Sequence, residues 1–350
     1  MPTSPPPSGG LRGRLASGPV ICAEGYLFEL ERRGFLQAGA FVPEVVLEHP
    51  DVVRGLHREF VHAGSDVVEA FTYYAHREKL RVIGQEQLLE PLNRRALEIA
   101  GEVARESGTL FAGDICNTNV WGEDAESRRR VRAMFDEQVG WAAEAGVDFV
   151  IGETFQWVEE ALLACEAIRD AGLEAVMTIS IHQDPRTREG LTPAEACRRL
   201  ADAGAIVVGL NCSRGPQTML PLLADIRAAV DVSVAALPVP YRTHVHEPTM
   251  QSLRDPQPLD GYLDRPFPTA LDPFTCSRYD VAAFTREAAA LGVDYLGLCC
   301  GAAPHHIRAM AEALGRTPPS SRYSADMTKH AYFGSEQGLQ EDNLAFSARL

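Results

Sequence analysis

The chain has 350 residues, of which 45% are hydrophobic and 23% charged, an ordinary composition for a globular protein. Its 48 acidic and 33 basic residues give a formal net charge of −15, which repels nucleic-acid phosphates, and no apolar run approaches the roughly 20 residues that span a bilayer. We therefore expect no nucleic-acid partner and no membrane segment. The eight cysteines do not form a dense framework, and we expect a cytoplasmic protein with reduced thiols.

The two ends of the chain differ in composition from its middle. The first ten residues are rich in Pro and Ser and lack the cationic start and apolar run of a signal peptide. A second polar stretch begins near residue 317 with the run PPSS. We predict a disordered lead-in over residues 1–17, one folded domain over residues 18–316, and a C-terminal tail over residues 317–350 that lies outside this domain.

Eight short apolar runs rich in β-branched residues recur along the chain. Each is followed by a polar or Gly-containing turn and then, in most cases, by a segment with helical periodicity. Several are continuously apolar, as expected for parallel strands that are covered on both faces. In chain order the predicted strands are 19–23, 66–73, 109–113, 147–152, 175–180, 205–210, 232–237 and 293–298.

The segments between these runs predict amphipathic helices. They are rich in Ala, Leu, Glu and Arg and often end at Gly, for example at 129–145, 158–171, 193–203 and 281–291. Eight strands that alternate with helices predict an α/β protein with a single (β/α)8 TIM barrel. An open doubly wound sheet is the alternative, but no G-x-G-x-x-G turn follows the first strand. The long irregular segment 238–273 after the seventh strand is typical of a functional or disordered loop.

Three cysteines follow predicted strands at the end of the barrel where catalytic residues gather. Cys212 follows the sixth strand, and Cys299 and Cys300 follow the eighth, next to Gly301. Three thiolates with one open position suit a catalytic zinc ion, and a thiol substrate bound there is deprotonated near neutral pH. Vicinal cysteines also have other readings, as buried apolar groups or as a redox-active pair.

Acidic and aromatic residues also mark this end of the predicted barrel. Glu24 follows the first strand and Glu153 follows the fourth, where carboxylates are able to bind a substrate ammonium group. The alternative is that each carboxylate stabilises a helix N-terminus. Four aromatic residues suit one wall of a pocket for a quaternary ammonium or sulfonium group, or alternatively the core: Tyr26, Phe41, Tyr73 and Tyr74.

Five motifs are specific enough to compare with known families: ELERRG at 29–34, EHP at 48–50, GLNC at 209–212, GLCCG at 297–301 and PHHIRA at 304–309. From about residue 21 to residue 314 the chain resembles the homocysteine S-methyltransferases, and within them the betaine–homocysteine methyltransferases. The resemblance implies a zinc ion held by Cys212, Cys299 and Cys300. It also implies transfer of a methyl group to the thiol of homocysteine, which yields methionine.

The resemblance extends to residues that bind the two substrates. Glu153 matches the acidic residue that binds the amino group of homocysteine, and Tyr74 matches a tyrosine of the donor pocket. Glu24 and Gly25 stand where the family usually has an Asp-Gly turn, and we expect both to bind substrate. Phe41 is also expected in the donor pocket, where it stands in place of a tryptophan.

The identity of the methyl donor is less constrained by the sequence, since Thr154 replaces a tyrosine of the family's donor pocket. We expect a betaine-like quaternary ammonium or sulfonium donor. The alternative donors are S-methylmethionine, dimethylsulfoniopropionate and a methylated amine, with homocysteine or another thiol as acceptor. A further alternative is a barrel that binds zinc without catalysis. The resemblance also implies a homo-oligomer.

Overall fold

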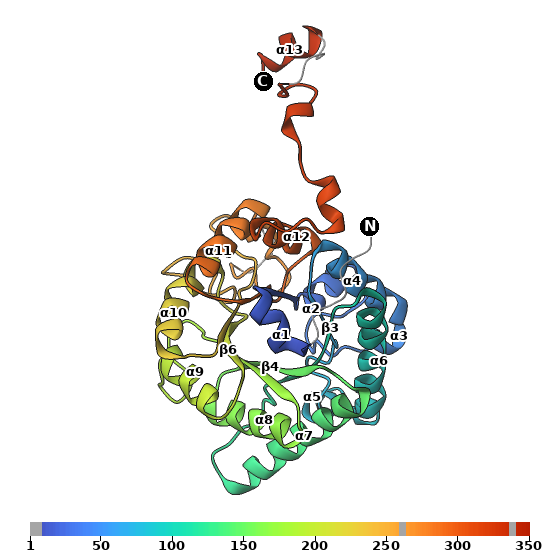
Figure 1. Cartoon of the computed structure of the whole chain (residues 1–350), viewed down its shortest axis with the longest axis vertical. Helices are drawn as coiled ribbons and strands as arrows, with labels where there is room; N and C mark the ends of the chain where they lie inside the picture. Colours follow the sequence, from blue (N-terminus) through green and yellow to red (C-terminus); the bar gives the residue numbers. More distant parts are fainter. Residues whose placement is uncertain (1–8, 259–263, 336–340) are drawn as a thin grey trace.

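The computed structural model describes residues 9–258, 264–335 and 341–350 and contains a closed barrel of eight parallel strands inside a ring of helices (Figure 1). Neighbouring strands pair in chain order, and the last strand closes the barrel by pairing with the first from Val20↔Tyr295 to Ala23↔Leu298. The strands are β1 Val20–Ala23, β2 Val67–Glu69, β3 Leu110–Cys116, β4 Phe149–Phe155, β5 Glu174–Ile179, β6 Val207–Asn211, β7 Ser233–Leu237 and β8 Tyr295–Leu298. The predicted TIM barrel is confirmed.

The helices of the barrel begin where the local sequence supplies capping groups. Asp124 accepts hydrogen bonds from the first backbone N–H groups of α7, and Thr192 and Ser277 form capping boxes at the starts of α9 and α11. The helices after β1 are α2 Tyr26–Arg32, α3 Val45–Glu48, α4 Pro50–Ala63, α5 Arg77–Val82, α6 Leu89–Ser107, α7 Ala125–Ala145, α8 Val158–Asp170, α9 Pro193–Asp202, α10 Pro216–Ala229, α11 Arg278–Ala290 and α12 Pro304–Ala313.

The inside of the barrel is filled by alternate residues of the strands. Because successive side chains of a strand point to opposite faces, every second residue turns inward. Val67, Leu110 and Ile151 belong to this buried apolar interior. Further toward the carboxyl ends of β2, β3 and β4, the inward positions are Glu69, Asp114 and Glu153, so the apolar filling of these strands ends below the mouth of the barrel.

The amino-terminal end of the barrel is closed by a helix that the sequence analysis did not predict. Residues 1–17 were expected to be disordered, and this prediction is wrong for the second half of the segment, because Gly10–Ser17 form helix α1. Leu11 of this helix is fully buried among the interior residues of the barrel. The two glycines of α1 give the segment little helical propensity, so packing against the barrel stabilises it. Residues 1–8 lie outside the described part.

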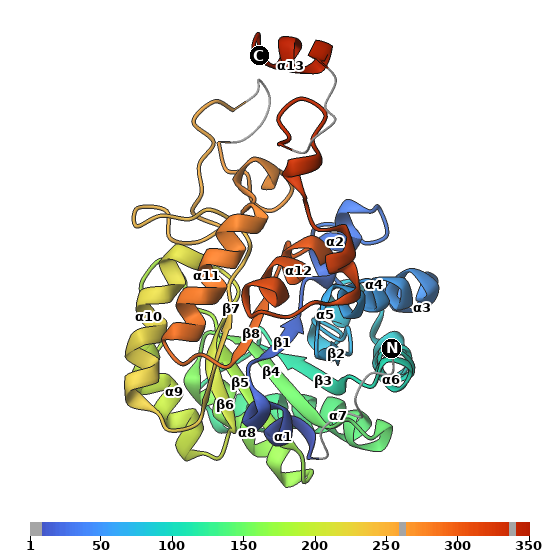
Figure 2. The same ribbon diagram turned by 45° about the horizontal axis from the view of Figure 1, so that its top comes forward.

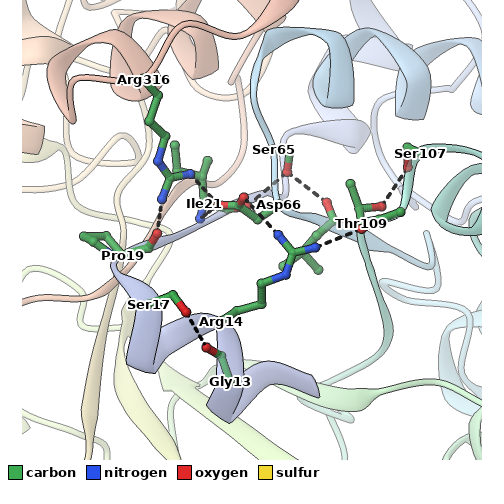
Figure 3. Close-up of polar contacts among 12 residues, drawn as sticks. Gly13, Arg14, Ser17, Pro19, Ile21, Ser65, Asp66, Ser107, Thr109 and Arg316 are labelled. Carbon is green, nitrogen blue, oxygen red and sulfur yellow. Dashed lines mark hydrogen bonds and ion pairs between the residues drawn. The ribbon is translucent and has the colours of Figure 1, made fainter. Parts of the chain in front are cut away.

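Asp66 links α1 to the rest of this face (Figure 3). Its carboxylate accepts a hydrogen bond from the Ile21 amide at 2.8 Å and pairs with the Arg316 guanidinium at 2.6 Å. Arg14 of α1 lies 3.8 Å from the same carboxylate and donates to the Gly108 carbonyl at 2.8 Å. These contacts join the start of β2, the end of the predicted domain and helix α1.

The opposite end of the barrel carries the long segment 238–273, whose residues 259–263 lie outside the described part. Figure 2 places this segment at the end opposite α1. After the barrel, the short helix η3 Pro319–Tyr323 packs against α4 and α12, and residues 324–335 and 341–350 extend away from the barrel (Figure 1). The division into barrel and tail stays a prediction. No helix of the described residues is long and apolar enough to cross a membrane.

Candidate active site

Three thiols from distant parts of the chain meet at the mouth of the barrel. Cys212 directly follows β6, and Cys299 and Cys300 directly follow β8. The three Sγ atoms lie within 4.8 Å of one another, and the Sγ of Cys300 is 3.9 Å from each of the other two. Gly301 has a φ of 95°, which lets the chain turn so that both neighbouring cysteines face the same centre.

The spacing of these thiols fits a zinc ion. Two sulfurs bound to one tetrahedral zinc at 2.3 Å are about 3.8 Å apart, close to the separations around Cys300. Three sulfur ligands and one open position are the arrangement of a catalytic zinc site. Hydrogen bonding with Cys299 and Cys300 lowers the pKa of Cys212. Hydrogen bonding with Cys212 and Cys300 raises the pKa of Cys299, so Cys212 is the favoured thiolate of this pair.

A layer of carboxylates lies beside the thiols, inside the barrel. Its four members are all less than one-tenth exposed: Glu24, Glu69, Asp114 and Glu153. They line a cavity, which we call the acidic cavity, that also contacts Cys299 and Cys300. Both carboxylate oxygens of Glu24 and one each of Glu69 and Asp114 have no hydrogen-bond partner among the described residues. Burial, followed by repulsion from the neighbouring carboxylates, raises the pKa of these three groups. Such a cluster strongly favours a cationic ligand.

Glu153 is the one carboxylate of this layer that is held by side-chain hydrogen bonds. Asn211 Nδ2 and Thr154 Oγ1 both donate to its Oε2, the latter at 3.0 Å. Asn211 also contacts Cys299 Sγ at 3.9 Å and accepts a bond from the Thr154 amide at 2.9 Å. Burial, with the charge of Cys212 as a second cause, raises the pKa of Glu153 to about 8. Because Asn211 contacts both Glu153 and Cys299, it connects the carboxylate layer to the thiols.

Gly25 places the first of these carboxylates. The amide of Glu24 donates to the Leu298 carbonyl at 3.2 Å, which continues the pairing of β1 with β8. A Cβ at Gly25 would lie 2.6 Å from both the Cβ and the carbonyl oxygen of Ala302, so only glycine allows this close approach. The turn after β1 therefore packs directly against the turn that carries Cys299 and Cys300.

A second cavity, of about 180 Å³, contacts Cys212 and Cys300 and adjoins the first cavity at Leu27, Tyr73 and Cys300. Its lining includes the expected Phe41 and Tyr74, and also Tyr73. All six non-glycine residues with positive φ in the described chain line this cavity: Phe41, Tyr74, Asn119, Thr154, Cys212 and Ser213. Such residues cost roughly 1–3 kcal/mol each and cluster at functional sites. The strain makes this cavity, which we call the aromatic cavity, a candidate binding site.

The four aromatic residues named from the sequence divide between the two cavities. Tyr26 lines the first cavity, beside the carboxylates, and packs against His57 and Phe60 with ring centroids 4.8 and 5.5 Å away. Phe41 and Tyr74 line the second cavity, and Tyr73 lines both. The ring of Tyr74 lies 3.8 Å from the ammonium of Lys79, so one face of this ring already contacts a cation. The roles of Phe41 and Tyr74 in donor binding stay predictions.

Sequence reasoning missed Glu69, Asp114 and the bridging role of Asn211. A signal was available, because Glu69 and Asp114 lie two residues after the inward-facing Val67 and Ala112, and Asn211 lies four residues after Val207. The period of two along a strand turns all three inward. The predicted second strand ran past Glu69 to residue 73, and the predicted third strand stopped at residue 113, before Asp114. Errors in the strand ends therefore hid these polar positions.

A barrel with buried thiols at its mouth defines a metal-binding enzyme of the thiol-activating kind, and comparison with known proteins identifies the family. The model of the family described as Homocysteine S-methyltransferase matches residues 22–314. The chain is 37% identical over 342 residues to S-methylmethionine–homocysteine S-methyltransferase BHMT2 of Rattus norvegicus, covering 94% of this chain and 89% of the relative. The chain therefore belongs to the homocysteine S-methyltransferase family.

A second relative carries the name of a different methyl donor, and a solved structure shares the fold. Betaine–homocysteine S-methyltransferase 1 of Rattus norvegicus is 36% identical over 337 residues, covering 93% of this chain and 79% of the relative. The metallated form of the homocysteine methyltransferase MmuM from Escherichia coli has a TM-score of 0.67 at 18% identity, covering 86% of this chain and 99% of that chain. The predicted family and its zinc-binding cysteine triad are confirmed, whereas the donor is not fixed at this level of identity.

Proposed function

We propose that this protein transfers a methyl group from a quaternary ammonium or sulfonium donor to the thiol of homocysteine, forming methionine. One observation carries the proposal. Cys300 lines both the acidic cavity and the strained aromatic cavity, as do Leu27 and Tyr73, so two chemically different cavities meet beside the thiol cluster. A two-substrate transfer needs an acceptor site and a donor site that both adjoin the reacting centre, and two cavities that share Cys300 suit this requirement.

The acidic cavity suits the amino group of the acceptor. Glu24 and Glu153 approach Cys299 closely enough that one ligand is able to contact the carboxylates with its ammonium and the metal centre with its sulfur. The ammonium would satisfy oxygens that have no partner in the protein, which is worth more in a buried site than in water. Gly25 would let the backbone approach the same ligand. Glu69 and Asp114 add negative charge beneath it.

The aromatic cavity suits a donor whose methyl group is attached to a cationic centre. Tyr73 and Phe41 offer ring faces or edges to that centre. In the reaction the acceptor sulfur forms a bond to the methyl carbon as the bond from this carbon to the donor atom breaks. The electron pair stays on the donor nitrogen or sulfur, so the donor leaves as a neutral amine or thioether.

The chain's own residues would orient the reactants and exclude water. A zinc ion held by Cys212, Cys299 and Cys300 supplies a Lewis acid that keeps a bound thiol deprotonated at neutral pH. Asn211 fixes the position of Glu153 relative to Cys299 through the contacts described above. The strained backbone at Cys212 and Thr154 would hold the aromatic cavity in its open shape before the donor binds. Positioning of this kind is worth several kcal/mol.

The donor is tested by a panel offered with homocysteine: glycine betaine, S-methylmethionine and dimethylsulfoniopropionate. Mass detection of methionine identifies the donors that react. We expect the betaine-like compound to be used, with S-methylmethionine as the alternative because relatives of nearly equal identity carry either name. Bound zinc with no methionine from any donor would favour a non-catalytic barrel instead.

The metal ligands are tested with two single substitutions at buried cysteines. Cys299→Ser removes a proposed ligand, and we expect loss of both zinc and turnover. Cys197→Ser is the matched control, since Cys197 is fully buried and its sulfur contacts the Gly209 carbonyl rather than the thiol cluster. Full zinc content and turnover in Cys299→Ser would contradict the ligand assignment. A reversible disulfide without bound zinc would favour the redox alternative.

We also propose a homo-oligomer that the tail helps to form. Aromatic residues of the tail are exposed, among them Tyr332, Phe333 and Phe346. Exposed aromatic side chains of this kind are enriched at interfaces between subunits. Light scattering of the full chain and of a chain that ends at residue 316 tests this proposal, and an unchanged mass would contradict it.

A further inference from the structure

A cavity of about 700 Å³ lies next to the aromatic cavity, at the mouth of the barrel. Its walls come from the segment after β5, residues 180–188, and from residues 246–254 and Arg265 of the segment after β7. Gln156, His182 and Gln251 line both cavities, so the two spaces are neighbours separated by these side chains. Nothing in the proposed reaction of homocysteine with a small donor uses this 700 Å³ cavity.

The walls of this cavity concentrate positive charge on an acidic protein. Arg186, Arg188, Arg254 and Arg265 line it, against two carboxylates, although the whole chain has a formal net charge of −15. Most arginines that form ion pairs elsewhere in the described chain lie on the outer helices. In contrast, Arg186, Arg188 and Arg265 form no ion pair with any described residue. We call this space the arginine cavity.

The hydrogen bonds of Arg186 and Arg188 use only part of their donor capacity. The carboxylate of Glu195 is near enough to Arg186 for this arginine, after hydrogen bonds from Thr192, to contribute to lowering the pKa of Glu195. Arg186 donates to the Gly190 carbonyl at 2.8 Å and Arg188 donates to the Gln156 side-chain oxygen at 2.9 Å, and both partners are neutral. Arg254 has a carboxylate nearby, Asp264, at the longer distance of 3.5 Å. Guanidinium groups held by neutral partners keep N–H groups for a carboxylate or a phosphate.

The arginine cavity is also connected to the thiols through its shared wall. Gln156 lies two residues after Thr154, beyond the end of β4, and holds Arg188 through both its side chain and its backbone carbonyl. His182 lines both cavities, together with Arg188 in the arginine cavity and with Cys212 in the aromatic cavity. One ligand that passes Gln156 and His182 would therefore reach both the thiol cluster and the arginines.

The aromatic cavity itself offers no fixed positive charge. Its described lining contains no lysine or arginine, and the ammonium of Lys79 lies 3.8 Å from the ring of Tyr74 without lining the cavity itself. An anionic group on the donor would find its nearest lining cations across Gln156 and His182, in the arginine cavity. The charges of the two cavities thus suit opposite ends of one molecule, a cationic methyl-bearing centre and a distant anion.

We propose that the arginine cavity binds the anionic end of an extended methyl donor, whose methylated ammonium or sulfonium centre occupies the aromatic cavity. This inference rests on the proposed methyl transfer and specifies its donor class. The anion is a carboxylate or a phosphate separated by a spacer from the methylated atom. Arg186 and Arg254 bind this end, and Arg188, fixed by Gln156, lies at the boundary between the two cavities.

The test compares three probes that share one trimethylammonium group. Choline carries no anion, 4-(trimethylammonio)butyrate carries a carboxylate, and phosphocholine carries a phosphate. Isothermal titration at low ionic strength measures their affinities for the zinc-loaded full chain. We expect at least one anionic probe to bind roughly tenfold or more tightly than choline, as charge-assisted hydrogen bonds allow. The anion with the larger gain identifies whether the natural donor carries a carboxylate or a phosphate.

Two variants separate the arginine cavity from general electrostatics. In the double variant Arg186→Gln and Arg254→Gln we expect the advantage of the anionic probes over choline to disappear. Arg129→Gln is the matched control, because Arg129 is an exposed arginine of α7 that forms no ion pair with described residues, and it should keep the advantage. Circular dichroism melting verifies that each variant is folded. Equal or undetectable binding of all three probes, or an advantage that survives the double variant, overturns the inference.

The same preparations distinguish this inference from the proposed function. Methionine formation from homocysteine with glycine betaine or S-methylmethionine, without any anion-dependent binding, would remove the inference and leave the methyl transfer standing. Anion-dependent binding without methionine from any donor would remove the methyl transfer and leave an anion site without a reaction.

Discussion

Substitution of Gly301 by alanine tests how the metal-binding turn is held. A Cβ at Gly301 would lie 2.2 Å from the Tyr241 hydroxyl oxygen and 2.7 Å from the nearest ring carbon. Tyr241 is fully buried, and its hydroxyl is bonded to Arg32 at 2.8 Å, so the ring cannot simply move away. Arg32 also donates to the Gly301 carbonyl at 3.2 Å. The turn after Cys300 is therefore clamped between two side chains.

The magnitude follows from two separate costs. The positive φ of Gly301 costs alanine about 1–2 kcal/mol, and overpacking against Tyr241 adds about 1–3 kcal/mol. Gly315→Ala is the matched control, because Gly315 also has a positive φ of 76° but a Cβ there would meet no atom within 4 Å. The difference between the two variants therefore isolates the clash with Tyr241.

Urea unfolding gives the stability of each variant, and elemental analysis gives its zinc content. We expect Gly301→Ala to be less stable than Gly315→Ala by about 1–3 kcal/mol and to hold less zinc, because Cys299 and Cys300 move with the turn. In a double-mutant cycle, Tyr241→Phe removes the nearest clashing atom, so the two changes should cost less together than their sum. Equal stability and equal zinc content in the two glycine variants would refute this account.

Three further changes have defined outcomes. Asn211→Asp replaces the amide donor beside Glu153 with a like charge. We expect the KM for homocysteine to rise by roughly a hundredfold. A KM within twofold of that of the parent protein would contradict the bridging role of Asn211. Burial lowers the pKa of His57 to about 3, so the unfolded chain takes up a proton first as the pH falls below 6.5, and stability decreases. His57→Leu should remove about 2 kcal/mol of the loss between pH 6.5 and 5 in urea unfolding, and an unchanged pH dependence would show that another group causes it. Asp66→Asn weakens the contacts with Arg14 and Arg316, and denaturation should show a cost of about 1–3 kcal/mol, whereas full stability would show that α1 closes the barrel without them.

The carboxylate layer shows where sequence reasoning stopped. Glu69 stands in an apolar run and Asp114 just beyond one, and each has an unremarkable local context. Their meeting with Glu24 and Glu153 depends on which residues of four strands turn inward and on the stagger between those strands. Helix α1 was missed for a similar reason, because it is stabilised by packing of Leu11 in the barrel interior rather than by the helical propensity of its residues. The arginine cavity likewise joins segments that lie more than fifty residues apart.

The sequence by itself determined the alternation of strands and helices and the placement of three cysteines directly after two of the strands. Both are local patterns, and parallel strands around a barrel bring their carboxyl ends to one side whatever the details of packing. Only the tertiary structure decided which polar residues share the buried layer, where the backbone is strained and how the two cavities meet at Cys300. These features arise from strand register and from contacts between distant segments, and no short stretch of sequence contains that information.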